Sequence, residues 1–132
     1  MMNRTNTNTN TNTNTNTNTQ RFENRFIALD VSYELIETLS PLVSRIARHN
    51  RSLADQIFRA ASSVPANLAE GQRSEKGNKH KHYAIAHGSA NEVKAALYTA
   101  RAWGWIDGSD RALAVMDRLL ALLWRLTHPR CG

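Results

Sequence analysis

Apolar residues recur along much of this chain at intervals of three and four, the spacing that places them on one side of an α-helix. Four stretches show this pattern, and none shows the strict alternation typical of a β-strand. The pattern predicts helices over residues 23–49, 52–71, 78–103 and 109–127. Amphipathic helices joined by short links predict an all-α protein, an antiparallel up-down-up-down four-helix bundle.

Each of the first three predicted helices has an apolar seam that is expected to face the core. The first seam consists of Phe22, Phe26, Leu29, Tyr33, Ile36, Ser40, Val43 and Ala47. The second consists of Leu53, Ile57, Ala60, Val64, Asn67 and Gly71, and the third of Tyr83, Ala86, Ala90, Val93, Leu97 and Ala100. Proline removes a backbone donor, so Pro41 is expected to kink or split the first helix, and Pro65 to bend the second.

The helix ends are predicted from capping residues. Ser52 and Ser109 are suitable N-caps for the second and fourth helices. Gly71 and Gly104 are suitable stops for the second and third. The basic segment 72–81 is then expected to contain a polar link before the third helix begins.

The fourth predicted helix carries two adjacent apolar stripes. The first consists of Leu113, Met116, Leu120 and Leu123, and the second of Ala112, Val115, Leu119, Leu122 and Leu126. One stripe is enough to close a four-helix bundle. The second stripe predicts an interface with another subunit, formed by Val115, Leu119, Leu122, Trp124 and Leu126.

A chain of 132 residues is long enough for one domain. Residues 5–19 alternate strictly between Thr and Asn and offer nothing to bury, so we expect residues 1–21 to form a disordered tail. The bundle is expected to span 22–128 and a short tail 129–132. No apolar run approaches the roughly 20 residues of a membrane-spanning helix. The single cysteine excludes an intrachain disulfide and suits a cytoplasmic protein.

The formal net charge of +6 favours an anionic partner such as nucleic acid. The candidate phosphate-binding residues fall into two groups, which can lie at opposite ends of an antiparallel bundle. One group is Arg45, Arg48, Arg51 and Arg59, and the other is Arg73, Lys76, Lys79 and Lys81. No base-reading motif accompanies them, so any recognition of RNA or DNA is expected to use backbone and shape. The alternative is that these basic side chains are simply solvated and bind no nucleic acid.

Polar residues interrupt the seams of the second and third helices. The structural polar motif consists of Asn67, Glu70, Gly71, Gly88, Ser89 and Glu92. An unpaired buried polar group costs roughly 1–3 kcal/mol. The motif is therefore either a hydrogen-bond network that fixes how the two helices pair, the favoured interpretation, or a ligand site. Gly88 is expected to allow a close approach between helices, and Asn67→Leu to raise stability or alter assembly.

No catalytic or metal-binding pattern is visible, so no enzymatic activity and no cofactor are expected. A di-metal bundle site uses Glu-x-x-His, but Arg73 and Ala95 stand three residues after Glu70 and Glu92. The spacing of His80, His82 and His87 does not place them on one helical face. Neither a nucleophile elbow nor a glycine-rich phosphate loop is present.

Three motifs together resemble a known family. They are Leu29-Asp30-Val31, the segment Ser63-Val64-Pro65-Ala66-Asn67-Leu68-Ala69-Glu70-Gly71, and the segment Ile85-Ala86-His87-Gly88-Ser89-Ala90-Asn91-Glu92. With them, residues 26–127 resemble the four-helix-bundle proteins encoded within intervening sequences of bacterial 23S ribosomal RNA genes. Ser32 departs from the large aromatic residue often found after the first motif.

The resemblance implies a bundle that assembles into a ring-like homopentamer. The same group includes the accessory variability determinants of diversity-generating retroelements, which bind reverse transcriptase and nucleic acid. The expected function is therefore a non-enzymatic, homo-oligomeric adaptor for RNA or DNA, with a reverse transcriptase as one possible protein partner. The alternatives are a protein-only scaffold and a membrane-surface protein that uses the fourth helix. Asp110 and Asp117 on that helix argue against the membrane.

Overall fold

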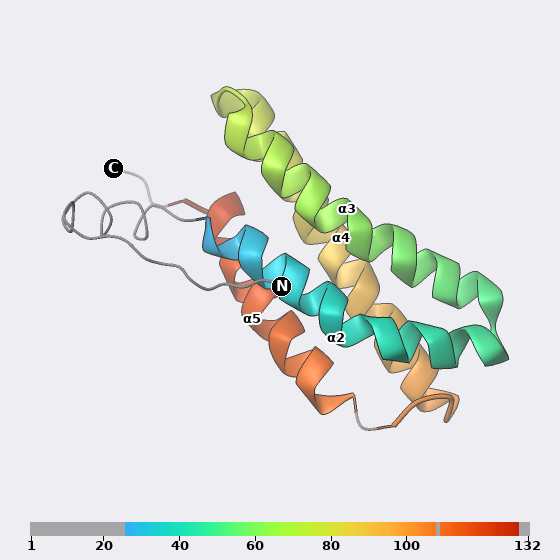
Figure 1. Ribbon diagram of the computed structural model, residues 1–132. Helices are drawn as coiled ribbons and strands as arrows, with labels where there is room; N and C mark the ends of the chain where they lie inside the picture. Colours follow the sequence, from blue (N-terminus) through green and yellow to red (C-terminus); the bar gives the residue numbers. More distant parts are fainter. Residues whose placement is uncertain (1–25, 108, 130–132) are drawn as a thin grey trace, which may run out of the picture.

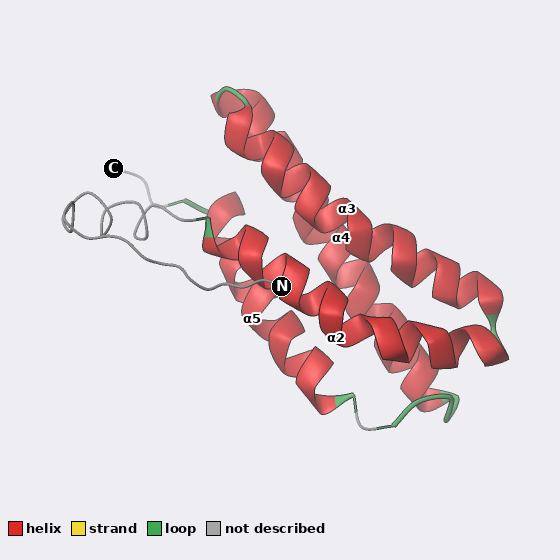
Figure 2. Cartoon of the chain, viewed as in Figure 1, coloured by secondary structure: helices red, strands yellow, loops and turns green. Residues whose placement is uncertain are grey.

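The computed structural model describes residues 26–107 and 109–129. Their helices are α2 (Ile27–His49), α3 (Arg51–Arg73), α4 (Lys76–Ala102) and α5 (Asp110–Thr127). Each helix packs antiparallel against the next, and α5 returns to pack against α2 (Figure 1). Figure 2 shows only helices and loops in this part of the chain. The predicted all-α four-helix bundle is therefore confirmed.

Some of the expectations concern parts of the chain that lie outside the described residues. These are the Thr-Asn tail at 1–21, the start of the first seam at Phe22, and Cys131. They stay predictions.

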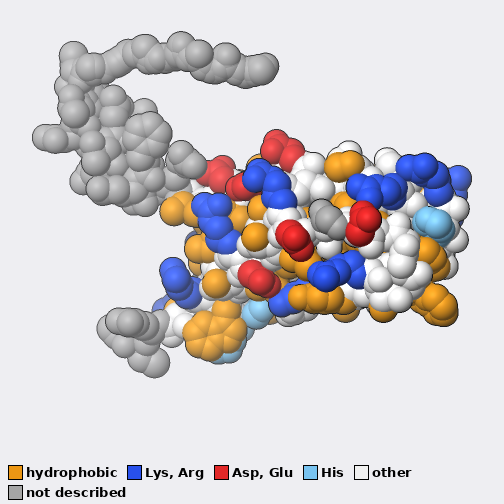
Figure 3. Space-filling view, turned by 90° about the horizontal axis from the view of Figure 1, so that it is seen from below, with side chains coloured by type: hydrophobic (Ala, Val, Ile, Leu, Met, Phe, Trp, Pro, Cys, Tyr) orange, Lys and Arg blue, Asp and Glu red, His pale blue; other side chains and the backbone are white. Residues whose placement is uncertain are grey.

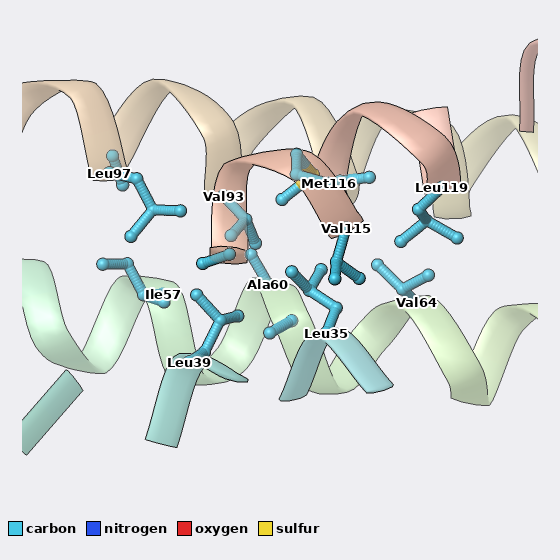
Figure 4. Packing of buried hydrophobic residues seen from close by; sticks show 14 of the residues in the cluster. Leu35, Leu39, Ile57, Ala60, Val64, Val93, Leu97, Val115, Met116 and Leu119 are labelled. Carbon is cyan, nitrogen blue, oxygen red and sulfur yellow. The ribbon is translucent and has the colours of Figure 1, made fainter. Parts of the chain in front are cut away.

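The core lies along the bundle axis and receives side chains from all four helices (Figure 4). The predicted seam of α4 is buried along its whole length, and that of α3 is buried except for Leu53 and Asn67, which are half-buried. The seam predicted for α2 is wrong by one position. The buried face of α2 consists of Ala28, Val31, Leu35, Leu39, Leu42 and Ile46.

Two neighbouring stripes of α2 are apolar, which explains the error. The predicted stripe contains larger aromatic residues, but Tyr33 and Ser40 are exposed and Leu29, Ile36 and Val43 are only half-buried. The stripe of leucines beside it faces α3 and α5 instead. Ser32 lies on the buried face, where a larger side chain was expected, and its hydroxyl donates to the Leu29 carbonyl at 2.6 Å.

The helix boundaries differ from the sequence expectation at the two ends of α3. Asn50, not Ser52, is the N-cap, and its side chain accepts a hydrogen bond from the Leu53 amide at 2.8 Å. At the other end α3 continues past Gly71 to Arg73, and the Ser74 hydroxyl donates to the Glu70 carbonyl. Only two residues therefore separate the end of α3 from the start of α4 at Lys76. Most of segment 72–81, which was expected to contain a polar link, is helical.

Helix α5 begins after Ser109 as predicted, although the Ser109 hydroxyl makes no capping hydrogen bond. Gly104 follows the end of α4 with φ +80°, as expected for a glycine stop. Pro41 and Pro65 lie inside continuous helices, so neither proline splits its helix.

Gly71, rather than Gly88, is the glycine at which two helices come close. A Cβ atom at Gly71 would lie 2.6 Å from Cε1 and 2.9 Å from Cδ1 of Tyr83 on α4. A Cβ atom at Gly88 would meet nothing within 4 Å, because Gly88 is on the exposed side of α4. The expectation for Gly88 is therefore wrong.

Beyond this contact the α3–α4 hairpin projects away from the start of α2 and the end of α5 (Figure 1). Residues 72, 73 and 75–78 at its tip are exposed. The tip therefore presents Arg73 and Lys76 of the second basic group to solvent; Lys81, further along α4, is also exposed, and Lys79 is half-buried.

Candidate nucleic-acid interface

The hairpin tip carries the second basic group predicted from the sequence. Arg73 ends α3 and pairs with Glu70 at 2.9 Å, an exposed ion pair of the kind that contributes little to stability. Lys76, Lys79 and Lys81 lie on the first turns of α4. These three lysines have no ion pair among residues 26–107 and 109–129. They are free to contact an anion.

The first basic group lies where α2 passes into α3. Arg45 pairs with the exposed carboxylate of Asp107 at 3.3 Å. Arg48, Arg51 and Arg59 are exposed and have no ion pair within the part of the chain that the structure describes. Most of this group is therefore also unneutralised.

The two basic groups do not form one patch. Arg51 and Arg73 are the first and last residues of α3, so they lie roughly 33 Å apart at 1.5 Å per residue. On the face that Figure 3 shows, acidic and basic side chains are interspersed across the middle of the molecule. Each end of the bundle must therefore be considered as a separate surface.

The polar motif forms a hydrogen-bond network between α3 and α4. The Asn67 amide donates to the Ser63 carbonyl and to the Ser63 hydroxyl, both at 3.0 Å. The Ser89 hydroxyl donates to the Ser63 hydroxyl at 3.1 Å, and His82 Nδ1 lies 3.0 Å from Asn67 Oδ1. All four side chains are half-buried. The network satisfies polar groups that would otherwise oppose the packing of these two helices.

The remaining members of the motif lie apart from this network. Glu70 and Glu92 are exposed, and Glu70 pairs with Arg73. Gly71 is the point of close approach to Tyr83, whereas Gly88 is exposed. Sequence reasoning missed His82, although its position next to Tyr83 places it at the edge of the α4 seam.

The apolar surface predicted for α5 is largely internal. Val115 and Leu119 are 6% and 0% exposed and point into the chain's own core (Figure 4), so neither is available to another subunit. Leu122 and Leu126 are half-buried against the same core. Only Trp124 is exposed, and its ring stacks on His128 at a centroid distance of 4.1 Å. The prediction that Val115 and Leu119 of α5 contact another subunit is therefore wrong.

One partly exposed apolar surface lies instead along α2 and α3. A groove of about 250 Å³ runs between these two helices. Its apolar walls are Ile36, Leu39, Val43, Ile57, Phe58 and Ala61. Phe58, on the wall of this groove, is 65% exposed. Ile36 and Val43, which the sequence pattern assigned to the core, are half-buried and also line this groove.

Neither a metal site nor a membrane span is found in the described part of the chain. Among residues 26–107 and 109–129, no cluster of His, Asp and Glu side chains is suited to hold a metal ion. None of the described helices has an apolar stretch long enough to cross a bilayer.

A family model described as 23S rRNA-intervening sequence protein matches residues 25–124, which include α2, α3, α4 and most of α5. The chain belongs to this family. The motifs that suggested the family lie on α2, α3 and α4 of this 23S rRNA-intervening sequence protein, and two of them meet in the network around Asn67. No curated protein and no solved structure matches the chain.

Proposed function

We propose that this 23S rRNA-intervening sequence protein is a non-enzymatic, homo-oligomeric adaptor that binds RNA or DNA, with a ring-like pentamer as its assembly. The observation that carries the proposal is the presence of unpaired arginines and lysines at both ends of the bundle. A cytoplasmic location is part of the same proposal.

Repetition of the chain around a ring multiplies the effect of these charges. One copy presents a few unpaired cations at each end, a modest field that salt screens within about 10 Å at 0.1 M. Several copies arranged about one axis would place equivalent clusters side by side. Since neutralised phosphates release counterions, such a surface binds a polyanion with a strong dependence on salt.

The groove between α2 and α3 supports self-association. Its walls are largely apolar, and Phe58 stands beside it with most of its ring in water. Removing apolar surface from water contributes about 25 cal/mol per Å². A second copy that covers Phe58 and the half-buried Ile36 and Val43 would gain this free energy.

Salt-dependent binding tests the adaptor. Binding to structured RNA and to duplex DNA is measured by gel shift at several salt concentrations, with the full-length protein and with a Lys76→Ala/Lys79→Ala variant. We expect the log–log salt slope on duplex DNA to fall by about 0.9 for each phosphate contact that is lost. Lys94→Ala is the matched control, because Lys94 on α4 already pairs with Asp117 at 3.0 Å. An assembled protein that binds neither nucleic acid at low salt refutes the adaptor and favours a protein-only scaffold.

Light scattering tests the assembly. We expect the full-length protein to be larger than a monomer at micromolar concentration, and Phe58→Asp to reduce that size. Trp124→Asp is the control, because Trp124 is also exposed but lies on α5, away from the groove. A stable monomer at micromolar concentration, or equal effects of the two variants, refutes assembly through α2 and α3.

A further inference from the structure

The segment that follows α4 brings two tryptophans together around a glycine. Gly104 adopts φ +80°, a left-handed conformation that glycine tolerates without strain. The Trp103 and Trp105 rings lie with centroids 5.9 Å apart and planes at 14°. His49, at the end of α2, stacks with Trp105 at 5.7 Å and 4°. Three nearly parallel rings thus lie at one end of the bundle.

Trp103 is far more exposed than its neighbour. Trp105 is half-buried and packs against the core, whereas Trp103 is 69% exposed. Indole rings are among the largest apolar surfaces that a protein can bury. The stack with Trp105 therefore leaves most of the Trp103 ring available to a further flat partner.

A recess of about 250 Å³ adjoins these indoles. Its walls include Asn50, Ser52, Gln56, Thr99, Trp103 and Trp105. Asn50 uses its side-chain oxygen to cap α3, and its amide nitrogen is not part of that bond. Aromatic faces next to amide and hydroxyl groups are what an unpaired nucleobase requires, because the ring stacks while its edge makes hydrogen bonds.

Three arginines lie close in the sequence to residues that line the recess. Arg48 and Arg51 flank His49 and Asn50 in the sequence, and Arg101 precedes Trp103 by two residues. None of these three arginines has an ion pair among the residues that the structure describes. At the right-hand end of Figure 3, where α2 meets α3, basic, histidine and apolar side chains lie together.

The acidic side chains close to the recess are few. Asp55 lies one turn beyond Arg51 on α3, and Asp107 is paired with Arg45. The unpaired arginines therefore outnumber the unpaired carboxylates, and the charge of the surface complements a polyanion.

We propose that Trp103, supported by Trp105 and His49, is a stacking platform for an unpaired base of single-stranded RNA or DNA. Arg48, Arg51 and Arg101 contact the phosphates on either side of that base. Stacking on aromatic side chains within a basic groove is the common means of binding single strands without reading their sequence. This inference rests on the proposed adaptor function and specifies the form of nucleic acid that it binds.

Fluorescence anisotropy with three labelled probes tests the platform. The probes are a thymidine oligonucleotide, an abasic oligonucleotide with the same number of phosphates, and a duplex. We expect the full-length protein to bind the thymidine strand more tightly than the abasic strand. Trp103→Ala should weaken binding of the thymidine strand about 5- to 150-fold, since one stacked base contributes roughly 1–3 kcal/mol. Its binding of the abasic strand and of the duplex should not change.

Two further variants make the test specific. Trp103→Phe should keep most of the affinity, because phenylalanine retains a ring on which a base can stack. Trp124→Ala should have no effect, because Trp124 is exposed on α5 but does not line the recess. Circular dichroism and light scattering establish that every variant has the helical content and the size of the unmodified protein.

The outcomes separate this inference from the proposed function. If Trp103→Ala binds the thymidine strand normally, or loses the abasic strand equally, the platform is refuted and the adaptor stands. If Trp103→Ala changes the size of the assembly, the indole contacts another subunit and the platform is again refuted. If the unmodified protein binds none of the three probes, the adaptor and the platform both fail.

Discussion

The contact between Gly71 and Tyr83 predicts opposite effects for two glycine-to-alanine substitutions. Both Gly71 and Gly88 lie inside helices, where alanine is favoured over glycine by about 1 kcal/mol. At Gly88 the new methyl group meets nothing within 4 Å, so Gly88→Ala should stabilise the protein by about that amount.

At Gly71 the new methyl group has no space. It would lie 2.6 Å from a ring carbon of Tyr83 and 3.2 Å from the Cβ atom of His82. The Tyr83 ring is buried and packs against Phe26 at a centroid distance of 5.7 Å, so it cannot simply swing into solvent. Overpacking of this kind costs typically about 1–3 kcal/mol. The two variants should therefore differ in free energy of unfolding by about 1–3 kcal/mol.

Thermal and urea unfolding of the two variants measure this difference. For a domain of about this size, 1 kcal/mol shifts Tm by roughly 4–8 °C, so the ranking is easily resolved. In a Tyr83→Ala background the ring is absent, and Gly71→Ala should no longer be destabilising relative to Gly88→Ala. If Gly71→Ala stabilises the unmodified protein as much as Gly88→Ala does, the two helices do not approach closely at Gly71, and the reasoning is refuted.

Two further predictions concern α3 and α4. Asn67→Ala removes three side-chain hydrogen bonds and should lower the free energy of urea unfolding by about 1–3 kcal/mol. The control Asn91→Ala, on the exposed side of α4, should change this free energy by less than about 0.5 kcal/mol. Equal effects of the two variants would show that the network has no structural role. Burial raises the pKa of Tyr83 above its ordinary value of 10.0. The unfolded chain therefore ionises this phenol first, and stability should fall as the pH rises above about 10. Thermal melts should show a shallower fall for Tyr83→Phe than for Tyr98→Phe, since Tyr98 is exposed, and identical slopes would contradict the assignment.

The fold follows from the sequence because helix type depends on local spacing. The period of three and four is clear in all four segments, and most residues of the predicted α3 and α4 seams are buried. Which face of α2 turns toward the core cannot be predicted from the sequence in the same way. Ala28, Leu35 and Leu42 each lie one position from Leu29, Ile36 and Val43, so two apolar faces compete, and only the position of α3 and α5 decides between them.

The candidate site was less predictable, because it depends on residues that are distant in the chain. The basic groups are visible in the sequence, but their separation by the length of α3 is a property of the bundle. His49 and Trp105 are 56 positions apart, and no local pattern indicates that their rings stack. A possible signal was the Trp-Gly-Trp triplet after Arg101, since exposed aromatic residues beside arginine are typical of nucleic-acid surfaces.

An even number of antiparallel helices brings the chain into α2 and out of α5 at the same end of the bundle (Figure 1). Phe26 and Ile27 line one shallow depression together with Leu122 and Leu126, so entry and exit are neighbours. A fluorophore or surface tether attached before α2 or after α5 would join the bundle at the end opposite to Trp103 and Trp105. Immobilised protein would then hold Trp103 and Trp105 toward the solution, which suits surface-based measurements of oligonucleotide capture.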